Sequence, residues 1–386
     1  MATDSLAVGL SPAALTSHAA AVRRPQSSGF RRVLTAALGP RVYHALRQAQ
    51  WAAASDFGDK RFSWSQKLWA WRRGFTASSA ALYDFPANDW REYLSDYTRE
   101  NQGVTINAVP QIFDQKLMLR SLLLHHGFAQ AETVALVGLA DAQIDPLGPA
   151  SRMASLADLE EMLRLDGGPF IVKPQDSGFG YGVSLVETRD GQLIKRRGLR
   201  SMPFHVKPWR ASTLVERAVA QHEFWSRLFP DSANTIRVLT MWTPGDGEPF
   251  IASAAQRIGA SDTAPTDNFH GGGTGAPVDV ETGTLGAARG FASDGRLVRL
   301  THHAETGAPI EGLTLPFWKE IRETVLRAAS LFGIARYVGW DLLVNREGIP
   351  VIIEGNANTG VHVLQLGEGL LKDPATRRFY QAFGVF

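Results

Sequence analysis

The stretch IARYVGWDLLVNREGIPVIIEGNANT, residues 334–359, contains two short apolar segments joined by Asn-Arg-Glu-Gly at 345–348. Apolar segments on either side of a turn predict a β-hairpin. The first segment carries Asp341, and the second carries Glu354 followed two residues later by Asn356, which leaves the same face of a strand. If the strands pair, Asp341 can lie across from the other two, and three oxygen ligands on one face suit Mg2+. The alternative is two buried strands whose acids pair with Arg or Lys.

Length and composition are those of a soluble globular protein with two or three lobes. The chain has 386 residues, of which 44% are hydrophobic and 20% are charged. A net charge of +2 argues against a protein that coats nucleic acid. The chain has no cysteine, which excludes disulfides, thiolate catalysis and cysteine-ligated zinc. Since it shows neither an apolar run of membrane-spanning length nor a secretory pattern, we expect a cytoplasmic protein.

The region 1–109 is predicted to be mainly helical and basic, with residues 1–28 poorly ordered. Residues 1–80 hold 11 Lys or Arg against 3 Asp and no Glu, and they include four tryptophans, Trp51, Trp64, Trp69 and Trp71. We expect these tryptophans to pack a helical cap onto the main body while the arginines stay solvated. The alternatives are contact with a membrane surface or glycosyl-transfer machinery, and an organelle transit peptide. The segment WREYLSDYTRE, 90–100, is predicted as one short helix.

The main body is predicted to start at Pro110 with alternating helices and strands. Lys116 opens a helix that Gly127 ends, and the β-run PFIVK carries Lys173 at its end. A turn with three alternate glycines leads from that run to the strand GVSLVE; they are Gly178, Gly180 and Gly182. Alternate glycines let backbone N–H groups approach phosphate oxygens, and the lysine supplies charge. The turn joins strand to strand, so it is neither a Rossmann fingerprint nor a Walker loop, and a plain glycine-rich hairpin is the alternative.

Three further segments contribute charge downstream of the glycine turn. Leu214-Val215-Glu216 is a short strand ending in an acid, and its backbone could pair with adenine, with Glu216, Glu223 or His222 near the ribose hydroxyls. Arg237 lies within the strand NTIRVLT, and Arg257 ends the strand FIASAAQR. The loop at 268–273, which begins with Asn268, is rich in glycine. Two arginines and an amide-rich loop suit a site where negative charge develops on a transferring phosphoryl group, although structural Arg–carboxylate pairs would explain either arginine alone.

Taken in order, these features resemble the ATP-grasp superfamily, and within it the sugar-transfer-associated group related to glutamate-ligase-like proteins. The narrower likeness is carried by Gln221-His222, NTIRVLT (234–240), GGGTGAPVDVETG (271–283), HAETGAPIEG (303–312), LPFW (315–318) and VGWDLLV…IPVIIEGN. It covers about Phe113 to the C-terminus, and the region before it fits only through Gly74-Phe75 and Tyr93-Leu94-Ser95. The resemblance implies an α+β fold in which two lobes, 110–212 and 213–386, clasp ATP, with a helical N-terminal extension.

The resemblance also assigns roles to individual residues. It implies that ATP phosphates are bound by Lys116 and Lys173 with the glycine turn, and that Glu216 lies at the adenine edge. It implies that Mg2+ or Mn2+ is held by Asp341, Glu354 and Asn356, and that the transferring phosphoryl group is stabilised by Arg237, Arg257 and Asn268. In this group Gln221-His222 replaces the ribose-binding acid of many ATP-grasp enzymes, so Glu223 is the alternative for that contact.

The implied activity is an ATP-dependent carboxylate–amine ligase that works through an acyl phosphate. Its substrates would be a small-molecule carboxylate and an amine, with an amino sugar, a glycoconjugate or a small peptide as the acceptor. A kinase on the same lobes and a nucleotide-binding scaffold of polysaccharide machinery are the alternatives. Four histidines are candidates for the acceptor site, although each is more often structural or solvated: His270, His302, His303 and His362.

Overall fold

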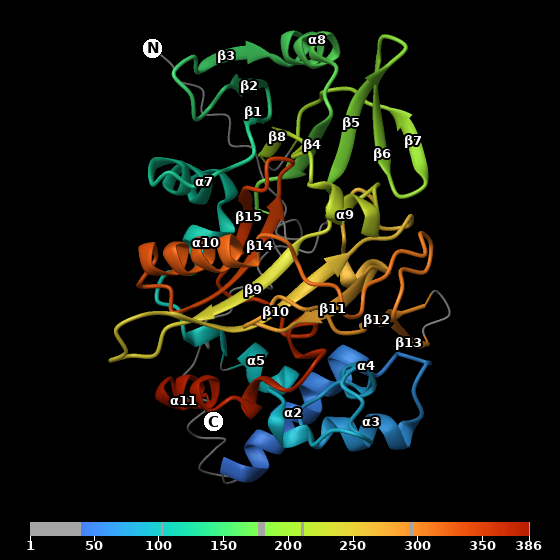
Figure 1. The fold of residues 1–386 in the computed structure, drawn as a ribbon, viewed down its shortest axis with the longest axis vertical. Helices are drawn as coiled ribbons and strands as arrows, with labels where there is room; N and C mark the ends of the chain where they lie inside the picture. Colours follow the sequence, from blue (N-terminus) through green and yellow to red (C-terminus); the bar gives the residue numbers. More distant parts are fainter. Residues whose placement is uncertain (1–39, 102, 177–181, 210–211, 293–295, 386) are drawn as a thin grey trace, which may run out of the picture. The chain divides into compact units, whose positions relative to one another are not determined.

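The computed structural model describes residues 40–101, 103–176, 182–209, 212–292 and 296–385 (Figure 1). The chain divides into two compact units, Met1–Phe57 and Gly58–Phe386. The segment 1–28, predicted to be poorly ordered, lies outside the described residues. Within the first unit the structure describes one helix, α2 (Pro40–Asp56). No helix among the described residues is both long and apolar enough to cross a membrane.

The second unit begins with a helical segment of short helices. These are α3 (Trp64–Trp71), α4 (Ala77–Leu82), η3 (Trp90–Glu92), α5 (Asp96–Asn101) and η4 (Gly103–Thr105). Side-chain caps start the first two helices, since Ser63 forms a capping box with Gln66 and Thr76 accepts from the Ser79 amide. The single helix predicted for 90–100 is wrong: the backbone is extended at Tyr93, which separates η3 from α5.

The first sheet contains eight antiparallel strands in the order β3-β2-β1-β8-β4-β5-β6-β7. The strands are β1 (Thr133–Val137), β2 (Asp141–Ile144), β3 (Arg152–Ser155), β4 (Phe170–Pro174), β5 (Ser184–Arg189), β6 (Gln192–Arg197), β7 (Arg200–Pro203) and β8 (Thr213–Arg217). Helix α8 (Leu156–Asp166) packs on this sheet through Leu159 and Leu163. It starts with a Ser155–Asp158 capping box and ends at Gly167 in the left-handed conformation.

The second sheet contains seven antiparallel strands in the order β13-β12-β11-β10-β9-β14-β15. The strands are β9 (Ile236–Met241), β10 (Phe250–Ile258), β11 (Thr274–Val278), β12 (Ala288–Phe291), β13 (Leu297–Leu300), β14 (Tyr337–Val344) and β15 (Pro350–Asn356). The predicted hairpin is confirmed as β14–β15, and the side chain of Asn345 closes its turn by accepting from the Ile349 amide at 2.8 Å.

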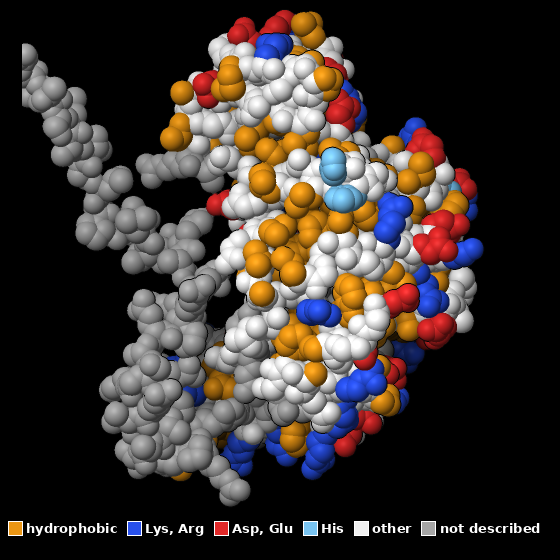
Figure 2. Space-filling view, turned by 90° about the vertical axis from the view of Figure 1, so that its left-hand side faces the viewer, with side chains coloured by type: hydrophobic (Ala, Val, Ile, Leu, Met, Phe, Trp, Pro, Cys, Tyr) orange, Lys and Arg blue, Asp and Glu red, His pale blue; other side chains and the backbone are white. Residues whose placement is uncertain are grey.

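Helices cover both faces of the second sheet (Figure 1). On one face α10 (Trp318–Leu331) packs through Ile321 and Val325, next to α6 (Gln111–Asp114), α7 (Lys116–His125) and α9 (Glu223–Leu228). The chain ends with η6 (Val363–Gln365), η7 (Leu370–Lys372) and α11 (Pro374–Ala382), which pack on the other face with the helical segment. Figure 2 shows hydrophobic side chains gathered over the side of the molecule where α7 and α10 lie. Exposed side chains on α7 are Met118, Leu122 and Leu124.

The helical segment is part of the body of the second unit rather than a separate domain. Phe75 and Tyr83 share a buried core with Leu239 and Met241 of β9. Asn107 ties the end of the segment to the sheet, because its amide group donates to the Tyr337 carbonyl and accepts from the Tyr337 amide. The tryptophans behave only partly as predicted: Trp69 contacts the Phe85 ring, whereas Trp64 is 55% exposed.

Two of the predicted boundaries therefore lie elsewhere in the structure. The division near 109 moves to residue 57, because the aromatic residues that follow it are buried against the second sheet. The division at 212 falls inside the first sheet, because β8 pairs with β1 on one side and β4 on the other. The strands of the first sheet thus run to Arg217, and those of the second begin at Ile236.

Candidate active site

A cavity of about 140 Å³ is lined by residues of both sheets, and we call it the interlobe cavity. Its charged and polar lining residues are Lys116, Lys173, Glu216, Arg217, Thr235, Arg257, Thr266, Asp267, Asp341 and Glu354. Apolar residues complete it, including Ile171 from β4 and Leu343 from β14. The two lysines and the two hairpin acids, which the sequence placed far apart, are thus brought to one cavity.

The wall from the first sheet holds a buried ion cluster around Glu216. One carboxylate oxygen of Glu216 accepts from Lys173 at 2.8 Å, and the other pairs with Arg120 of α7. All three side chains are nearly inaccessible to water. Burial alone would raise the pKa of Glu216, but the charges of Lys173 and Arg120 outweigh it and lower the pKa, so Glu216 is a carboxylate. The prediction missed Arg120, whose only signal was a cation on the apolar face of a helix.

Lys116 stands beside this cluster at the start of α7. Its ammonium group donates to the Gln175 carbonyl at 3.2 Å. Burial lowers the pKa of Lys116, and its attraction to Glu354 across the cavity offsets this only in part. With Lys116, Lys173 and Arg120 against one carboxylate, this wall carries an excess of positive charge and can bind an anion.

The second sheet contributes a row of charged side chains on adjacent strands, of which Arg257, Asp341 and Glu354 line the cavity. Arg237 of β9 lies opposite Asp341 of β14, which in turn lies opposite Glu354 of β15. A bulge directly after the Asp341–Glu354 pair lets the hairpin continue with Leu342 opposite Ile352. Arg257 follows two residues after Ala255, the residue of β10 that pairs with Arg237, so it shares their face.

Asp341 is held by both arginines of this row. Arg237 donates to both of its carboxylate oxygens, through Nε at 2.6 Å and through Nη2, and Arg257 donates to one of them at 3.1 Å. Burial would raise the pKa of Asp341, but the charges of Arg237 and Arg257 lower it to about 2. The structural Arg–carboxylate pairing left open by the sequence is therefore present at both arginines.

A second acid, Asp267, completes the pairing of Arg257. It binds Arg257 Nη2 and accepts from the backbone amide of Thr235 at 2.7 Å. Burial raises the pKa of Asp267 even with Arg257 beside it. Sequence reasoning missed this residue, although it directly precedes the predicted Asn268 loop.

Glu354 has less compensation than Asp341. Its nearest cation in the row is Arg237, at 4.0 Å. Burial raises the pKa of Glu354, and the charge of the facing Asp341 raises it further. The amide of Asn356 donates to Glu354 at 3.3 Å, so its carbonyl oxygen is not used in that bond. Among the described residues no three His, Cys, Asp or Glu side chains are grouped as a metal site, and a hard cation here would combine two carboxylates with the Asn356 carbonyl.

The fit of these residues to Mg2+ rests on Glu354, whose negative charge is less compensated than that of Asp341. Two carboxylates face each other across β14 and β15, and one of them holds a proton more tightly than an isolated glutamate does. A divalent cation removes such repulsion, and its remaining coordination positions are ordinarily filled by water and phosphate oxygens. The residues present therefore fit the ion.

The glycine of the first strand of the hairpin has a steric role. A Cβ atom at Gly339 would lie 2.4 Å from Oγ1 of Thr359, so a side chain there would displace that residue. Thr359 in turn accepts from Nη1 of Arg237 at 3.2 Å. The approach of segment 357–362 to the arginine row depends on this small residue.

Of the residues predicted near the ribose, Glu216 lines the interlobe cavity, and Gln221, His222 and Glu223 do not. The Gln221 amide binds the Ser232 carbonyl and the Asn234 amide, and the His222 side chain caps α9 by accepting from Phe224. Glu223 is exposed on α9 and pairs with Arg227 at 3.1 Å. These contacts explain the local Gln-His pattern as a turn and a helix start. The residue of this segment that does line the cavity is Val219.

The two predicted loops are only partly described. Gly178 and Gly180 lie outside the described residues, while Gly182 has a positive φ of 78° and packs against Pro174. The strands that flank this turn, β4 and β5, pair as predicted. Asn268 caps the short helix η5 (Phe269–Gly271) by accepting from the His270 amide at 3.2 Å, and it does not line the interlobe cavity.

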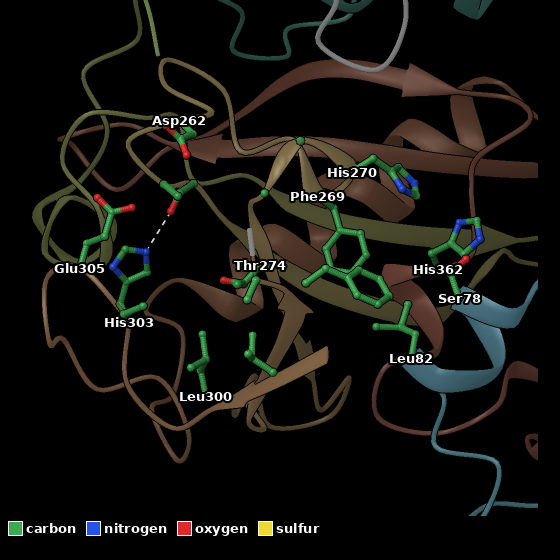
Figure 3. A pocket seen from close by; sticks show the side chains of 18 of the residues that line it. Ser78, Leu82, Asp262, Phe269, His270, Thr274, Leu300, His303, Glu305 and His362 are labelled. Atoms are coloured by element: carbon green, nitrogen blue, oxygen red, sulfur yellow. Dashed lines mark hydrogen bonds between the residues drawn. The ribbon is translucent and has the colours of Figure 1, made fainter. Parts of the chain in front are cut away.

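A second cavity of about 760 Å³ lies between the helical segment and the second sheet, and we call it the histidine cavity (Figure 3). His270, His303 and His362 line it, whereas His302 is exposed elsewhere. His303 is structural, because its two ring nitrogens bond the Gly259 carbonyl at 2.9 Å and the Thr306 hydroxyl at 3.1 Å. The rings of His270 and His362 lie edge to face with centroids 5.2 Å apart.

Solved structures with a similar fold include several enzymes. An L-amino acid ligase from Bacillus licheniformis is 15% identical with a TM-score of 0.34, over 65% of this chain and 42% of that chain. A biotin carboxylase complex from Campylobacter jejuni is 12% identical with a TM-score of 0.40, over 75% and 53%. A D-alanine–D-alanine ligase from Bacillus anthracis is 13% identical with a TM-score of 0.36, over 81% and 76%. The chain thus spans about half the length of the first two, and no curated protein matches it.

The family comparison covers the same region as the two sheets. The model of the family described as sugar-transfer associated ATP-grasp matches residues 97–377, well over half of the chain. That range includes both walls of the interlobe cavity and the β14–β15 hairpin. The chain belongs to the sugar-transfer associated ATP-grasp family and has an α+β ATP-grasp fold with a helical N-terminal region.

Proposed function

We propose that this protein is an ATP-dependent carboxylate–amine ligase that forms an amide bond and releases ADP and phosphate. One observation carries the proposal: in the interlobe cavity, a wall with two lysines faces a wall with a facing pair of carboxylates and Arg257, and Arg237 binds one of those carboxylates. The first wall suits phosphates and the second suits a divalent cation and a transferring phosphoryl group.

In the proposed phosphoryl transfer, the two sheets contribute charged groups with different roles. Lys116 and Lys173 bind the phosphates, and Glu216 holds Lys173 at the end of β4. Asp341, Glu354 and Asn356 would hold Mg2+ or Mn2+, and the ion would supply positive charge against the phosphates. Arg237 and Arg257 stabilise the charge on the transferring group, since Arg257 lines the cavity and Arg237 binds Asp341 directly beside it, each fixed by an acid.

We place the adenine contact at a different position from the one expected from sequence, which was Glu216. The backbone of β8 is shared with β1 and β4, and Glu216 is occupied by two cations. We therefore assign the adenine edge to the segment directly after β8, where Val219 lines the cavity. The ribose contact stays unassigned, because Gln221 and His222 are used in local structure.

The reaction has two steps. A carboxylate oxygen of one substrate attacks the γ-phosphorus of ATP, the bond to the β-phosphate oxygen breaks, and ADP leaves with an acyl phosphate remaining. An amine nitrogen then attacks the acyl carbon, and phosphate leaves with the electron pair of the broken C–O bond. The protein mainly positions reactants and neutralises charge. The words sugar-transfer in the family description support an amino sugar or a glycoconjugate as the amine, and a small peptide is the other candidate. ATP dependence favours the cytoplasm.

The test is a substrate screen with the full chain. Purified protein is incubated with ATP and Mg2+ against a matrix of L- and D-amino acids and short dicarboxylates crossed with amino acids, amino sugars and alkylamines. ADP release and product mass are recorded together. ADP release that needs both a carboxylate and an amine, with an amide product, supports the ligase. A phosphorylated hydroxyl compound would identify a kinase, and ATP binding without any substrate-dependent ADP release would overturn an enzymatic role.

A further inference from the structure

The histidine cavity is formed by two parts of the second unit that are distant in sequence. Ser78 and Leu82 come from α4 of the helical segment, whereas Phe269, Thr274 and Leu300 come from η5 and the edge of the second sheet. At about 760 Å³ it is several times larger than the interlobe cavity and lies in the range of small-molecule sites. Nothing in the phosphoryl-transfer chemistry accounts for it.

Its lining changes character from one end to the other (Figure 3). Asp262 and Glu305 lie together at one end. The apolar side chain of Phe269 lies between the two ends, and Leu82 lies near His362 and Ser78. His270 and His362 lie side by side at the far end, next to Ser78. A ligand that fits this lining has an apolar or extended body, a group near the histidines and hydrogen-bond donors toward the acids.

The histidine end contains a carboxylate–histidine pair. Asp96 of α5 is buried, and its Oδ1 lies 3.4 Å from Nε2 of His362. Burial would raise the pKa of Asp96, but the contact with His362 and the Thr76 amide bond lower it, so Asp96 is a carboxylate. No hydrogen bond joins the two groups at this distance, so the pair is a close contact in which a hydrogen on Nε2 would face the carboxylate and leave the lone pair of Nδ1 for a proton. His362 keeps 30% of its side-chain surface accessible.

The neighbouring His270 is electrically neutral near pH 7. Protein packed around its ring, then the charges of His362, Arg257 and Arg237, lower its pKa to about 4, although one side of the residue is open to solvent. A neutral imidazole beside His362 does not repel an incoming ammonium group. The charged groups that act on His270 are His362, Arg257, Arg237 and Asp96, and Arg61 is a further cation that lines the cavity.

The histidine end adjoins the arginine row of the interlobe cavity. Arg237, Leu239 and Met241 alternate on one face of β9, the face that packs against the helical segment. Thr359, three residues before His362, accepts from Arg237. On the other side Arg99 of α5, three residues after Asp96, donates to the Thr359 carbonyl at 3.2 Å. One short segment thus links the Asp96–His362 pair to the residues assigned to phosphoryl transfer.

We infer that the histidine cavity binds the amine substrate, and that His362, positioned by Asp96, removes the proton from its ammonium group. The amine class is a primary amine with an extended body and a hydroxyl or second ammonium group at its far end, which reaches Asp262. This inference rests on the proposed ligase function and names the site and chemistry of its second substrate.

The step balances without another reactant. Nδ1 of His362 accepts a proton from R–NH3+, which leaves R–NH2 with a lone pair. That lone pair forms the C–N bond with the acyl phosphate, and the C–O bond to phosphate breaks with its electrons on phosphate. The nitrogen then loses a second proton to solvent, and His362 returns its proton to solvent before the next turnover.

The test compares an amine that needs deprotonation with one that does not. Hydroxylamine is largely neutral near pH 7, so it traps an acyl phosphate as a hydroxamate without a base. In His362→Ala, amide formation with an alkylamine or amino sugar should fall about 100-fold or more. Hydroxamate formation should stay within about twofold of the parent protein. The control is His302→Ala, which changes an exposed histidine outside the cavity and should alter neither rate.

The outcomes separate the two proposals. If the parent forms no hydroxamate with any carboxylate, the ligase function itself fails. If the parent does so but His362→Ala keeps its amide-forming rate, the inference about His362 is overturned. If His362→Ala loses both rates equally, with an unchanged thermal unfolding midpoint, His362 acts on the first step and the inference is again wrong.

The far end of the cavity has its own test. Asp262→Asn should raise KM about tenfold for diamines and amino sugars, and leave KM for propylamine unchanged, because only the longer amines reach this acid. The kcat values should not change. Equal KM effects on propylamine and on diamines would overturn the assignment of the acidic end.

Discussion

The two walls of the interlobe cavity use buried charge in opposite ways. On the first sheet, Glu216 is bonded to Lys173 and Arg120, and its pKa is lowered. On the second sheet, Asp341 takes both arginines, and Glu354 is left facing it with a raised pKa. A compensated cluster fixes its lysine in one place. The less compensated acid of the second wall, Glu354, favours a cation that the protein does not supply. This difference separates the residues that hold the site together from those that take part in chemistry.

The largest effect on activity is expected from removing Glu354, the less compensated acid of the second wall. Glu354→Gln should lower substrate-dependent ADP release by about 10³-fold, because the cation that neutralises phosphate charge loses one carboxylate. The free energy of unfolding should change by less than about 1 kcal/mol, because the lost attraction to Lys116 is offset by relief from Asp341. Steady-state kinetics and denaturant unfolding measure the two quantities.

The matched control is Glu347→Gln in the turn of the same hairpin, where the side chain is exposed. It should leave both quantities as in the parent. If Glu354→Gln turned over ATP at the parent rate, the assignment of Glu354 as a metal ligand would be wrong.

On the wall from the first sheet, removing Glu216 should lower stability more than Glu354→Gln does. Glu216→Gln removes the only carboxylate bonded to Lys173 and Arg120 among the described contacts and leaves two buried cations, so we expect a loss of about 3 kcal/mol in unfolding free energy. Denaturant titration is the measurement. Glu223→Gln is the control, because that acid is exposed on α9 and should cost less than about 0.5 kcal/mol. Equal stability of the two variants would show that Glu216 does not hold the first wall.

Metal affinity should depend on pH through Glu354 and not through Asp341. Because the pKa of Glu354 is raised, the protonated form persists above the ordinary glutamate range and competes with the cation. Apparent affinity for Mg2+ should therefore rise with pH until Glu354 is ionised, by at most about tenfold per pH unit for one proton. Asp341, with a pKa of about 2, is already ionised throughout. Titration with Mn2+ followed by electron paramagnetic resonance measures this, and a pH-independent affinity would contradict it.

The smallest effect concerns stability without metal. A carboxyl group whose pKa is raised on folding stabilises the protein below its unfolded pKa, and this contribution is lost as pH rises through the folded pKa. The parent should thus lose unfolding free energy as pH rises from the ordinary pKa of glutamate through the raised pKa of Glu354. Comparison of unfolding curves for the parent and Glu354→Gln over a range of pH isolates the contribution of Glu354 to the pH dependence of the unfolding free energy. The idea fails if the two proteins show the same pH dependence over that range.

Local pattern was enough to predict the hairpin and its three polar residues. Alternate residues of a strand share a face, so Glu354 and Asn356 could be placed together, and a turn of four residues placed Asp341 opposite them. The same reasoning located Lys173 at the end of β4 and both arginines on strands of one sheet. These predictions hold because they depend on the backbone period and not on distant neighbours.

The partners of those residues could not be read in the same way. Arg120 pairs with Glu216 across 96 positions, and Arg257 reaches Asp341 across 84. Nothing in a local pattern says which cation meets which acid, so Glu216 was expected at the adenine edge although it is enclosed by two cations. The Gln221-His222 pair was likewise expected at the ribose, whereas its side chains close a turn and a helix start.

The sequence by itself determined the strands, the charged residues on them and the family. Only the tertiary structure decided that the helical segment joins the second sheet, because that depends on how Phe75 and Tyr83 are buried against Leu239. It likewise decided that Asp96 meets His362 beside a large cavity, because these residues lie far apart in the chain. Backbone periodicity is encoded over a few residues, whereas compensation of a buried charge is settled by whichever groups the fold brings within a few ångströms.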